Sequence, residues 1–310
     1  MVLKTWTVVL VVAAGALLAS ACSSGDESEQ VGGVRVVATT TILGDIARNI
    51  VGATGTVEVL LPIGADPHDY QPSSAQVAAI YNADLVIVNG LGLEEGLSDV
   101  LTGASGDGIN VVVVGGLVDP LSLGDRLSCD TDVSRTCDPH VWLDPQRVAL
   151  IGMIVGAELA PVDASVDWEV RAEEYATQMI RSDSAIEEIL AAVAEADRIL
   201  VTNHDSLGYF ADRYGFEVVG SVIPGGSTLS EPSSADLADL VELINERGVS
   251  TIFAETTEST ALADAIAAEV DHPVAVIRLF IGSLGEPGSG ADTLIGMLET
   301  NATLIAFGLS

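Results

Sequence analysis

The chain contains only four histidines, and their placement suggests metal chemistry. His68 follows a predicted strand that ends near Leu61, and His204 directly follows one that ends at Asn203. Ligands of open α/β sheets bind outside the carboxyl ends of the strands. Since neutral imidazole is the commonest zinc ligand, histidines on separate loops can converge on one ion in a cleft.

The other two histidines differ in their surroundings. His140 repeats the Asp-Pro-His sequence that contains His68, and each proline limits the backbone freedom of the turn before the imidazole. His272 precedes a predicted strand, so it lies at the opposite edge of the sheet and is interpreted as a turn residue. A lone loop histidine is most often a surface residue. Three with similar placement predict a metal site formed by His68, His140 and His204.

Eight short β-branched runs predict the strands that position these histidines. They are almost continuously apolar, which is typical of parallel strands covered on both faces. The runs cover residues 34–41, 56–62, 84–90 and 109–116 in the first half and 198–203, 216–222, 249–255 and 273–280 in the second. We therefore expect an α/β fold of two four-stranded, mainly parallel α/β lobes, an N-terminal lobe over 34–160 and a C-terminal lobe over 198–310.

Helices are legible between the strands. Residues 73–83 predict a helix with Ser73 or Ser74 capping its first turn, and residues 234–248 predict one that stops at Gly248. Both lie between predicted strands, as expected for crossover connections of a parallel sheet.

The two predicted lobes are separated by residues 161–197. Within this linker, residues 167–196 contain no glycine or proline and predict one helix of about 45 Å. Apolar residues recur along it at helical spacing, so one side should lie against the lobes. A single long rigid helix argues against wide hinge opening.

The N-terminus predicts export and a lipid anchor. Residues 1–21 combine the positive charge of Lys4, an apolar stretch too short to span a bilayer and small residues at its end, as signal peptides do. Cys22 follows in a lipobox-like sequence, and residues 22–33 have the composition of a flexible tether. We expect an extracytoplasmic protein anchored to the cell membrane through lipidated Cys22; the alternative is a plain secreted protein.

The charge and the cysteine content limit which partners and which cellular compartment are possible. The formal net charge is −33 and Lys4 is the only lysine, which argues against nucleic acid as a partner. Cys129 and Cys137 are close enough in sequence to form a disulfide in an oxidising compartment, which would stabilise the fold by about 2–3 kcal/mol. Their spacing excludes a zinc ribbon.

Five ordered blocks of sequence carry a family resemblance. They are PIGADPHDY (62–70), DPHVWLDP (138–145), TNHDSLGYFADRYG (202–215), EPSSADL (231–237) and SLGEPGSGADTLIGMLETN (283–301). Together they resemble the zinc- and manganese-binding solute-binding proteins of bacterial ABC importers. The resemblance implies two lobes joined by a long helix with metal between them. It also implies an ABC permease as partner and a monomer, with a metallochaperone as a further candidate partner.

The resemblance also assigns ligands. The first two family ligands fall on His68 and His140, and the third on His204, as in zinc-type members. Nitrogen ligands favour zinc (Zn²⁺) over manganese (Mn²⁺), so we expect a zinc receptor. The alternative is a manganese receptor of the same family. Many members carry an aspartate where this chain has Gly282. We expect Glu255 or a water molecule as the fourth ligand.

Two aspartates are further candidates for the fourth ligand. Asp205 or Asp66 would reach the metal only after a loop shift. The long His-rich loop of some members is absent, and residues 119–137 take its place as an acidic segment containing Cys129 and Cys137.

A hydrolase and an adhesin are the alternatives to a receptor. Three histidines and a water also describe a mononuclear zinc hydrolase, with Asp69 or Asp205 as base. However, the sequence contains no HExxH helix, nucleophile elbow or phosphate loop. A surface adhesin is a third class. We expect a binding protein and not an enzyme.

Overall fold

The computed structural model describes residues 33–123, 129–130 and 136–310. The predicted signal peptide, the lipidation site Cys22 and the tether lie outside these residues. The strands are β1 (Val34–Ala38), β2 (Gly55–Val59), β3 (Leu85–Val88), β4 (Val111–Val113), β5 (Ile199–His204), β6 (Glu217–Ile223), β7 (Thr251–Glu255) and β8 (Ala275–Leu279). The helices are α1 (Thr41–Val51), α2 (Ser74–Tyr81), α3 (Ser98–Gly106), α4 (Pro145–Leu159), α5 (Trp168–Leu190), α6 (Gly208–Tyr214), α7 (Ser234–Arg247), α8 (Ala261–Glu269) and α9 (Leu294–Gly308).

The strands form two parallel sheets, as the apolar runs predicted. The order is β2-β1-β3-β4 in the first sheet and β6-β5-β7-β8 in the second, and neighbouring strands in both sheets are parallel. The α/β fold of two four-stranded lobes is therefore confirmed. In each lobe the chain order reverses beside the first strand, β1 or β5, and the carboxyl ends of these two central strands lead into the loops around the site.

The predicted helix ends are present. Ser73 caps α2, with its hydroxyl accepting from Gln76 N while the Gln76 side chain accepts from Ser73 N. This reciprocal pair is a capping box. Helix α7 ends at Gly248, whose φ of 64° is the left-handed conformation that glycine adopts without strain.

The long helix is shorter than predicted. Helix α5 ends at Leu190 and does not continue to residue 196. The guanidinium of Arg198 donates to the carbonyls of Leu190 and Val193, at 3.3 Å each, and to Tyr214 O at 2.8 Å. The side chain just before β5 thus satisfies the carbonyl of the last helical residue, Leu190, through a tertiary contact that helix propensity cannot reveal.

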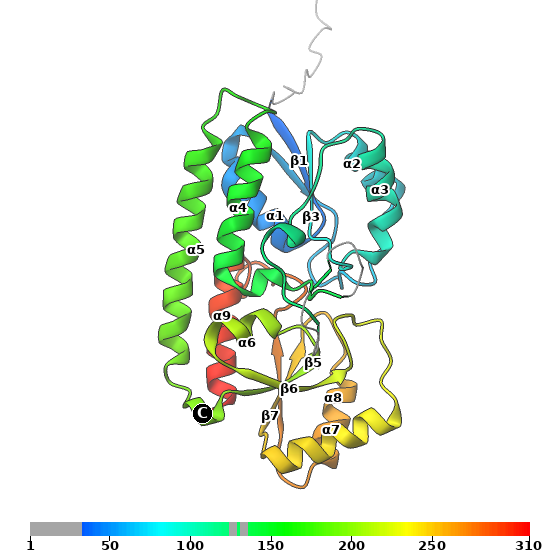
Figure 1. Ribbon diagram of the computed structural model, residues 1–310, viewed down its shortest axis with the longest axis vertical. Coiled ribbons are helices and arrows are strands. Elements are labelled where there is room, and N and C mark those ends of the chain that lie inside the picture. The colour runs from blue at the N-terminus through cyan, green and yellow to red at the C-terminus, as the bar shows by residue number, and fades with distance from the viewer. Residues whose placement is uncertain (1–32, 124–128, 131–135) are drawn as a thin grey trace, which may run out of the picture. The chain divides into compact units, whose positions relative to one another are not determined.

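One continuous apolar core runs through both lobes. Figure 1 shows α5 beside α4 and α9, extending past both sheets. Buried α5 side chains such as Trp168, Tyr175 and Ile186 belong to the same cluster as Ile46 of α1 and Phe253 of β7. The described residues between 33 and 310 form a single compact unit. Helices α4, α5 and α9 and the core that both lobes share therefore stiffen the connection between the lobes.

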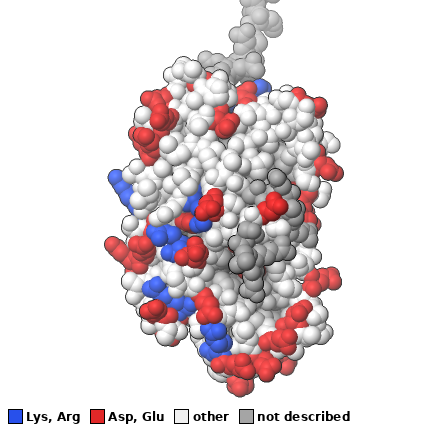
Figure 2. Space-filling view, viewed as in Figure 1, with Lys and Arg blue, Asp and Glu red and all other residues white. Residues whose placement is uncertain are grey.

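The described surface is acidic without an extended basic patch on the face shown. In Figure 2, acidic side chains lie around the whole outline, whereas arginines gather on one side. Some arginines form ion pairs, as Arg213 does with Asp183 and Arg247 with Glu217. Among the described helices, none is both long and apolar enough to cross a bilayer.

Candidate metal site

Three buried histidines meet between the two lobes. His68 lies in the loop after β2, His140 begins the short 3₁₀ helix Val141–Leu143, and His204 ends β5. One ring nitrogen from each lies within 4.8 Å of the others. The ring centroids are 4.9–5.6 Å apart, and only 1–2% of each residue is exposed. The structure thus brings together the three histidines that the sequence predicted.

The two Asp-Pro-His sequences fold into the same kind of turn. Asp66 Oδ1 accepts from His68 N, and Asp138 Oδ1 accepts from His140 N, each at 2.9 Å. An aspartate that accepts from the backbone two residues later forms an Asx turn. The aspartate and the proline between them therefore fix the backbone before each imidazole.

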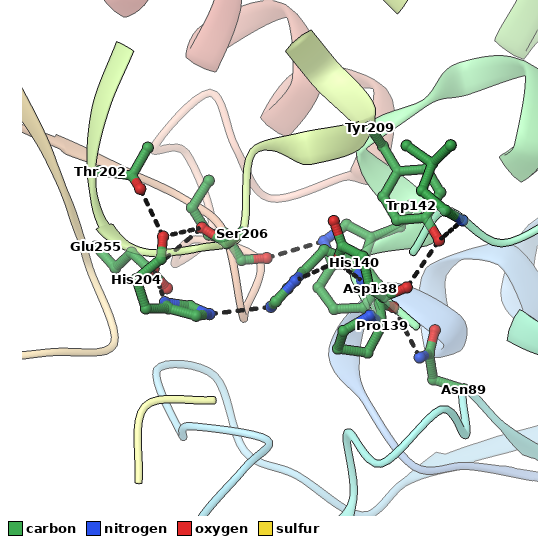
Figure 3. Close-up of polar contacts among 12 residues, drawn as sticks. Asn89, Asp138, Pro139, His140, Trp142, Thr202, His204, Ser206, Tyr209 and Glu255 are labelled. Atoms are coloured by element: carbon green, nitrogen blue, oxygen red, sulfur yellow. Dashed lines mark hydrogen bonds and ion pairs between the residues drawn. The ribbon is translucent and has the colours of Figure 1, made fainter. Parts of the chain in front are cut away.

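A carboxylate supports each of the two facing rings (Figure 3). Asp138 Oδ1 lies 2.7 Å from His140 Nδ1, and the Glu255 carboxylate pairs with His204 Nδ1. A carboxylate at Nδ1 holds the proton there and leaves Nε2 as the ligand atom. The two Nε2 atoms face each other at 3.0 Å. Sequence reasoning missed both roles, although β5 and β7 are neighbours and end beside each other.

The spacing suits a small tetrahedral ion. Zinc–nitrogen bonds of about 2.0–2.1 Å at tetrahedral angles separate the nitrogens by about 3.3 Å. The 3.0 Å between the Nε2 atoms of His140 and His204 is slightly less than this, and the group as a whole spans 4.8 Å. Adjustments of about an ångström would therefore complete the coordination.

Burial and charge set the protonation of the site. Burial and the charge of His204 lower the pKa of His140 to about 3, so this ring is neutral at pH 7. Burial raises the pKa of Asp138 to about 7, against the hydrogen bond from His140 N. For His204, burial lowers the pKa, but Glu255 and the charges of Asp66 and Asp138 together raise it more, so the net shift is upward. His204 is thus the ligand for which a proton competes with the metal ion.

The carboxylates considered for the fourth position lie outside the three-histidine group. Glu255 contacts His204 Nδ1 and accepts from the Ser206 hydroxyl at 3.4 Å. Asp66 is hydrogen-bonded to His68 N and to Thr228 Oγ1. In that group of mutually close ligand atoms, the described residues contribute only histidines. A zinc site with three histidines takes water as its fourth ligand when no carboxylate binds.

Two other residues of the sequence analysis lie outside this group. A Cβ atom at Gly282 would lie 3.0 Å from Pro67 Cδ, so the proline next to His68 closely approaches the place of the family's aspartate. His272 hydrogen-bonds to Asp271 and to Val249 O, ahead of β8, as expected for a turn histidine.

A buried polar network holds the His140 turn from the N-terminal lobe. Asn89 Nδ2 donates to Pro139 O at 2.9 Å. The Asn89 backbone is held in turn by Glu94, whose carboxylate accepts from Asn89 N, Gly90 N and Thr39 Oγ1 at 2.6–2.9 Å. Nothing in the spacing of these residues signals this role, because they meet only through the loop after β3.

The cysteine segment borders the same region. Cys129 and Cys137 are joined by a disulfide in the structure, with Cα atoms 4.9 Å apart. Cys137 and Pro139 line a cavity of about 350 Å³ together with Asp205 and Gly226 from the other lobe. The cavity therefore reaches the chain neighbours of His140 and His204 from both lobes.

Comparison with known proteins places this site in context. The family model described as the periplasmic component A of the zinc-uptake complex matches residues 36–308. The zinc-binding protein TroA of Treponema pallidum is 30% identical over 282 residues, covering 89% of this chain and 88% of TroA. The manganese-binding lipoprotein MntA of Halalkalibacterium halodurans is 29% identical over 299 residues, covering 95% of each chain.

Solved structures show the same fold. Periplasmic TroA from Treponema pallidum superposes with a TM-score of 0.81 at 30% identity, covering 90% of this chain and all of that one. A manganese-bound periplasmic metal-binding protein from Candidatus Liberibacter asiaticus gives a TM-score of 0.76 at 26% identity, covering 89% of this chain and all of that one. These relatives include both zinc and manganese binders.

Metal binding should weaken as pH falls through the pKa of His204. Below that raised pKa the metal must displace a proton, so log K should fall by about one unit per pH unit. Glu255→Gln removes the charge that raises the pKa. The break in the plot of log K against pH should therefore move to lower pH, and affinity above the break should fall about 10-fold to 100-fold.

This pH dependence can be measured by competition with a chromophoric chelator between about pH 5.5 and about pH 8.5. Glu258→Gln is the matched control: Glu258 lies near His204 but makes no ion pair with it among the described contacts. A break that stays at the wild-type pH in Glu255→Gln would refute the role given to this carboxylate.

Proposed function

Because this chain belongs to the family of periplasmic zinc-uptake components, which are metal receptors of ABC importers and not enzymes, we propose that it binds zinc outside the cytoplasm and delivers it to a membrane permease. One observation carries the choice of metal. Among the residues that the structure describes, the preformed group contains three imidazole nitrogens and no carboxylate oxygen. Imidazole suits zinc, whereas manganese depends more on oxygen ligands.

The proposed ligands are Nε2 of His140 and His204, one ring nitrogen of His68, and water in the fourth position. The hydrogen bonds of Asp138 and Glu255 support this choice of atoms. Glu255 then acts as the acceptor that orients His204. Zinc sites commonly have three protein ligands and one water.

Delivery requires that the receptor stays near its permease. We assign the anchor to lipidated Cys22, followed by the tether of residues 22–33. Curated relatives named as lipoproteins, such as MntA of Halalkalibacterium halodurans, support this assignment. The proposed unit is a monomer, and loading by a metallochaperone remains a separate prediction.

Manganese is the second candidate, favoured by the relatives that carry manganese in their names. Isotope uptake by cells separates the two. Deleting the gene should abolish most ⁶⁵Zn uptake under zinc limitation and leave ⁵⁴Mn uptake unchanged, and the wild-type gene should restore it. Loss of ⁵⁴Mn uptake with normal ⁶⁵Zn uptake would replace zinc by manganese in this proposal.

A further inference from the structure

We propose that Tyr209 is a positioning residue that locks the Asp138–His140 turn to the lobe carrying His204, and thereby sets the spacing and metal preference of the site. The inference rests on the proposed function, since it concerns the same three histidines. Tyr209 is the second residue of α6 and is completely buried. It belongs to the C-terminal lobe, yet its hydroxyl is bonded to residues of the N-terminal lobe.

The hydroxyl bridges two segments of that other lobe. Tyr209 Oη donates to Asp138 O at 2.7 Å and accepts from Leu121 N at 2.9 Å. Asp138 N donates back to Leu121 O at 2.8 Å, next to the antiparallel bridge between Ser122 and Cys137. The two segments therefore share one direct backbone bond, from Asp138 N to Leu121 O, and the phenol oxygen bridges Leu121 N and Asp138 O, where a second direct bond would otherwise form.

The ring is fixed as firmly as the hydroxyl. The Arg147 guanidinium lies 4.8 Å from the centroid of the Tyr209 ring, a cation–π distance. Arg147 is itself held by Asp144 and by Asp119 O. Tyr209 is thus enclosed by N-terminal-lobe groups on its edge and on its face.

The segment between His204 and Tyr209 is short and is held in place by a hydrogen bond and by packing. Ser206 N donates to His204 O at 2.8 Å, and Leu207, only 2% exposed, is packed into the shared core directly before α6. Any movement of the Tyr209 hydroxyl is therefore coupled to His204. On the other side, Asp138 binds both the backbone and the ring of His140.

These contacts form one chain from ligand to ligand: His204, α6, Tyr209, Asp138 and His140. Removing the hydroxyl leaves Leu121 N and Asp138 O without their bridging group. Unpaired buried backbone groups are costly, so Leu121 N and Asp138 O would tend to pair directly. That pairing would draw Asp138 toward Leu121. His140 would move with Asp138, which would change the 3.0 Å spacing between its Nε2 and that of His204.

The test is Tyr209→Phe in the full mature chain, with zinc, manganese and cobalt titrated separately. Zinc affinity should fall about 10-fold to 100-fold, as for other groups that orient metal ligands. Manganese affinity should fall less, so the zinc-to-manganese ratio should decrease. The visible absorption bands of the cobalt form should change, because they report ligand geometry.

Tyr214→Phe and Tyr175→Phe are the matched controls. Tyr214 lies on the same helix and its hydroxyl donates to Asp183, so its loss should lower the melting temperature without changing metal affinity or the cobalt spectrum. The buried Tyr175 hydroxyl has no hydrogen-bond partner among the described residues. Equal effects of Tyr209→Phe and Tyr214→Phe on zinc affinity, or an unchanged cobalt spectrum in Tyr209→Phe, would overturn the proposal.

A measurement on the wild type keeps the test decisive if the variant fails to fold. Amide hydrogen exchange at Leu121 should slow when zinc binds, together with exchange at His140, whereas exchange at Val170 near the start of α5 should not change. Unchanged exchange at Leu121 would contradict the coupling. A wild type that bound manganese and not zinc would refute the proposed function, while the Tyr209 comparison could still be made with manganese.

Discussion

Replacing His68, His140 or His204 by alanine should weaken zinc binding on the order of a thousandfold in each case. The estimate follows because a protein zinc site worth about 10–16 kcal/mol distributes this free energy over a few bonds. All three rings are buried and mutually close, so no other described histidine can take over. Zinc titration against a competing chelator measures the effect.

His272→Ala is the control for this series. His272 is hydrogen-bonded at the turn before β8 and is remote from the group, so its loss should leave zinc affinity unchanged. Melting curves of the metal-free variants would show whether each protein is folded. Equal losses for all four histidines would count against the assigned site.

Zinc should outcompete manganese at this site by on the order of a thousandfold or more. The group offers three nitrogens, and the aspartate that many family members carry is replaced by Gly282. Hard cations lose most when a carboxylate ligand is absent. Gly282→Asp should therefore strengthen manganese binding proportionally more than zinc binding, as measured by titration with each metal.

Steric fit must be separated from charge in that experiment. A side chain at position 282 begins 3.0 Å from Pro67 Cδ and 3.5 Å from Thr257 Oγ1, so it displaces the turn that carries His68. Gly282→Asn has nearly the same size without the charge, and it should show the steric loss alone. A wild-type protein that holds manganese as tightly as zinc would make the manganese receptor the better account.

Glu255→Ala adds a second arm to the comparison. If Glu255 orients His204, its loss should weaken zinc binding, and aspartate at position 282 should restore only the charge and not the orientation. Full rescue of Glu255→Ala by Gly282→Asp would instead indicate that Glu255 is itself the fourth ligand.

The strands and the three ligands were predictable for the same reason. A run such as that of β3 is apolar and buried on both faces, because helices cover both sides of a parallel sheet. Strand ends then fix where loop histidines can meet, as for His204 at the end of β5. Local sequence contains both signals.

Contacts between distant segments were not predictable in this way. The end of α5 depends on Arg198, which binds the carbonyl of Leu190. The core shared by Tyr175 and Phe253 joins residues of different lobes, so neither periodicity nor spacing reveals it. The Glu255–His204 pair required the order of the strands, because it forms across neighbouring β5 and β7.

The central claim is that the three histidines bind zinc through nitrogen, with water completing the coordination. Its most direct test is a crystal structure of the mature protein purified without chelators or added metal, with anomalous diffraction recorded on both sides of the zinc and manganese absorption edges. The account predicts one zinc ion per chain, about 2.0–2.1 Å from Nε2 of His140 and His204 and from one ring nitrogen of His68. A manganese signal at this position, or zinc bound elsewhere while the three rings stay in contact, would contradict it.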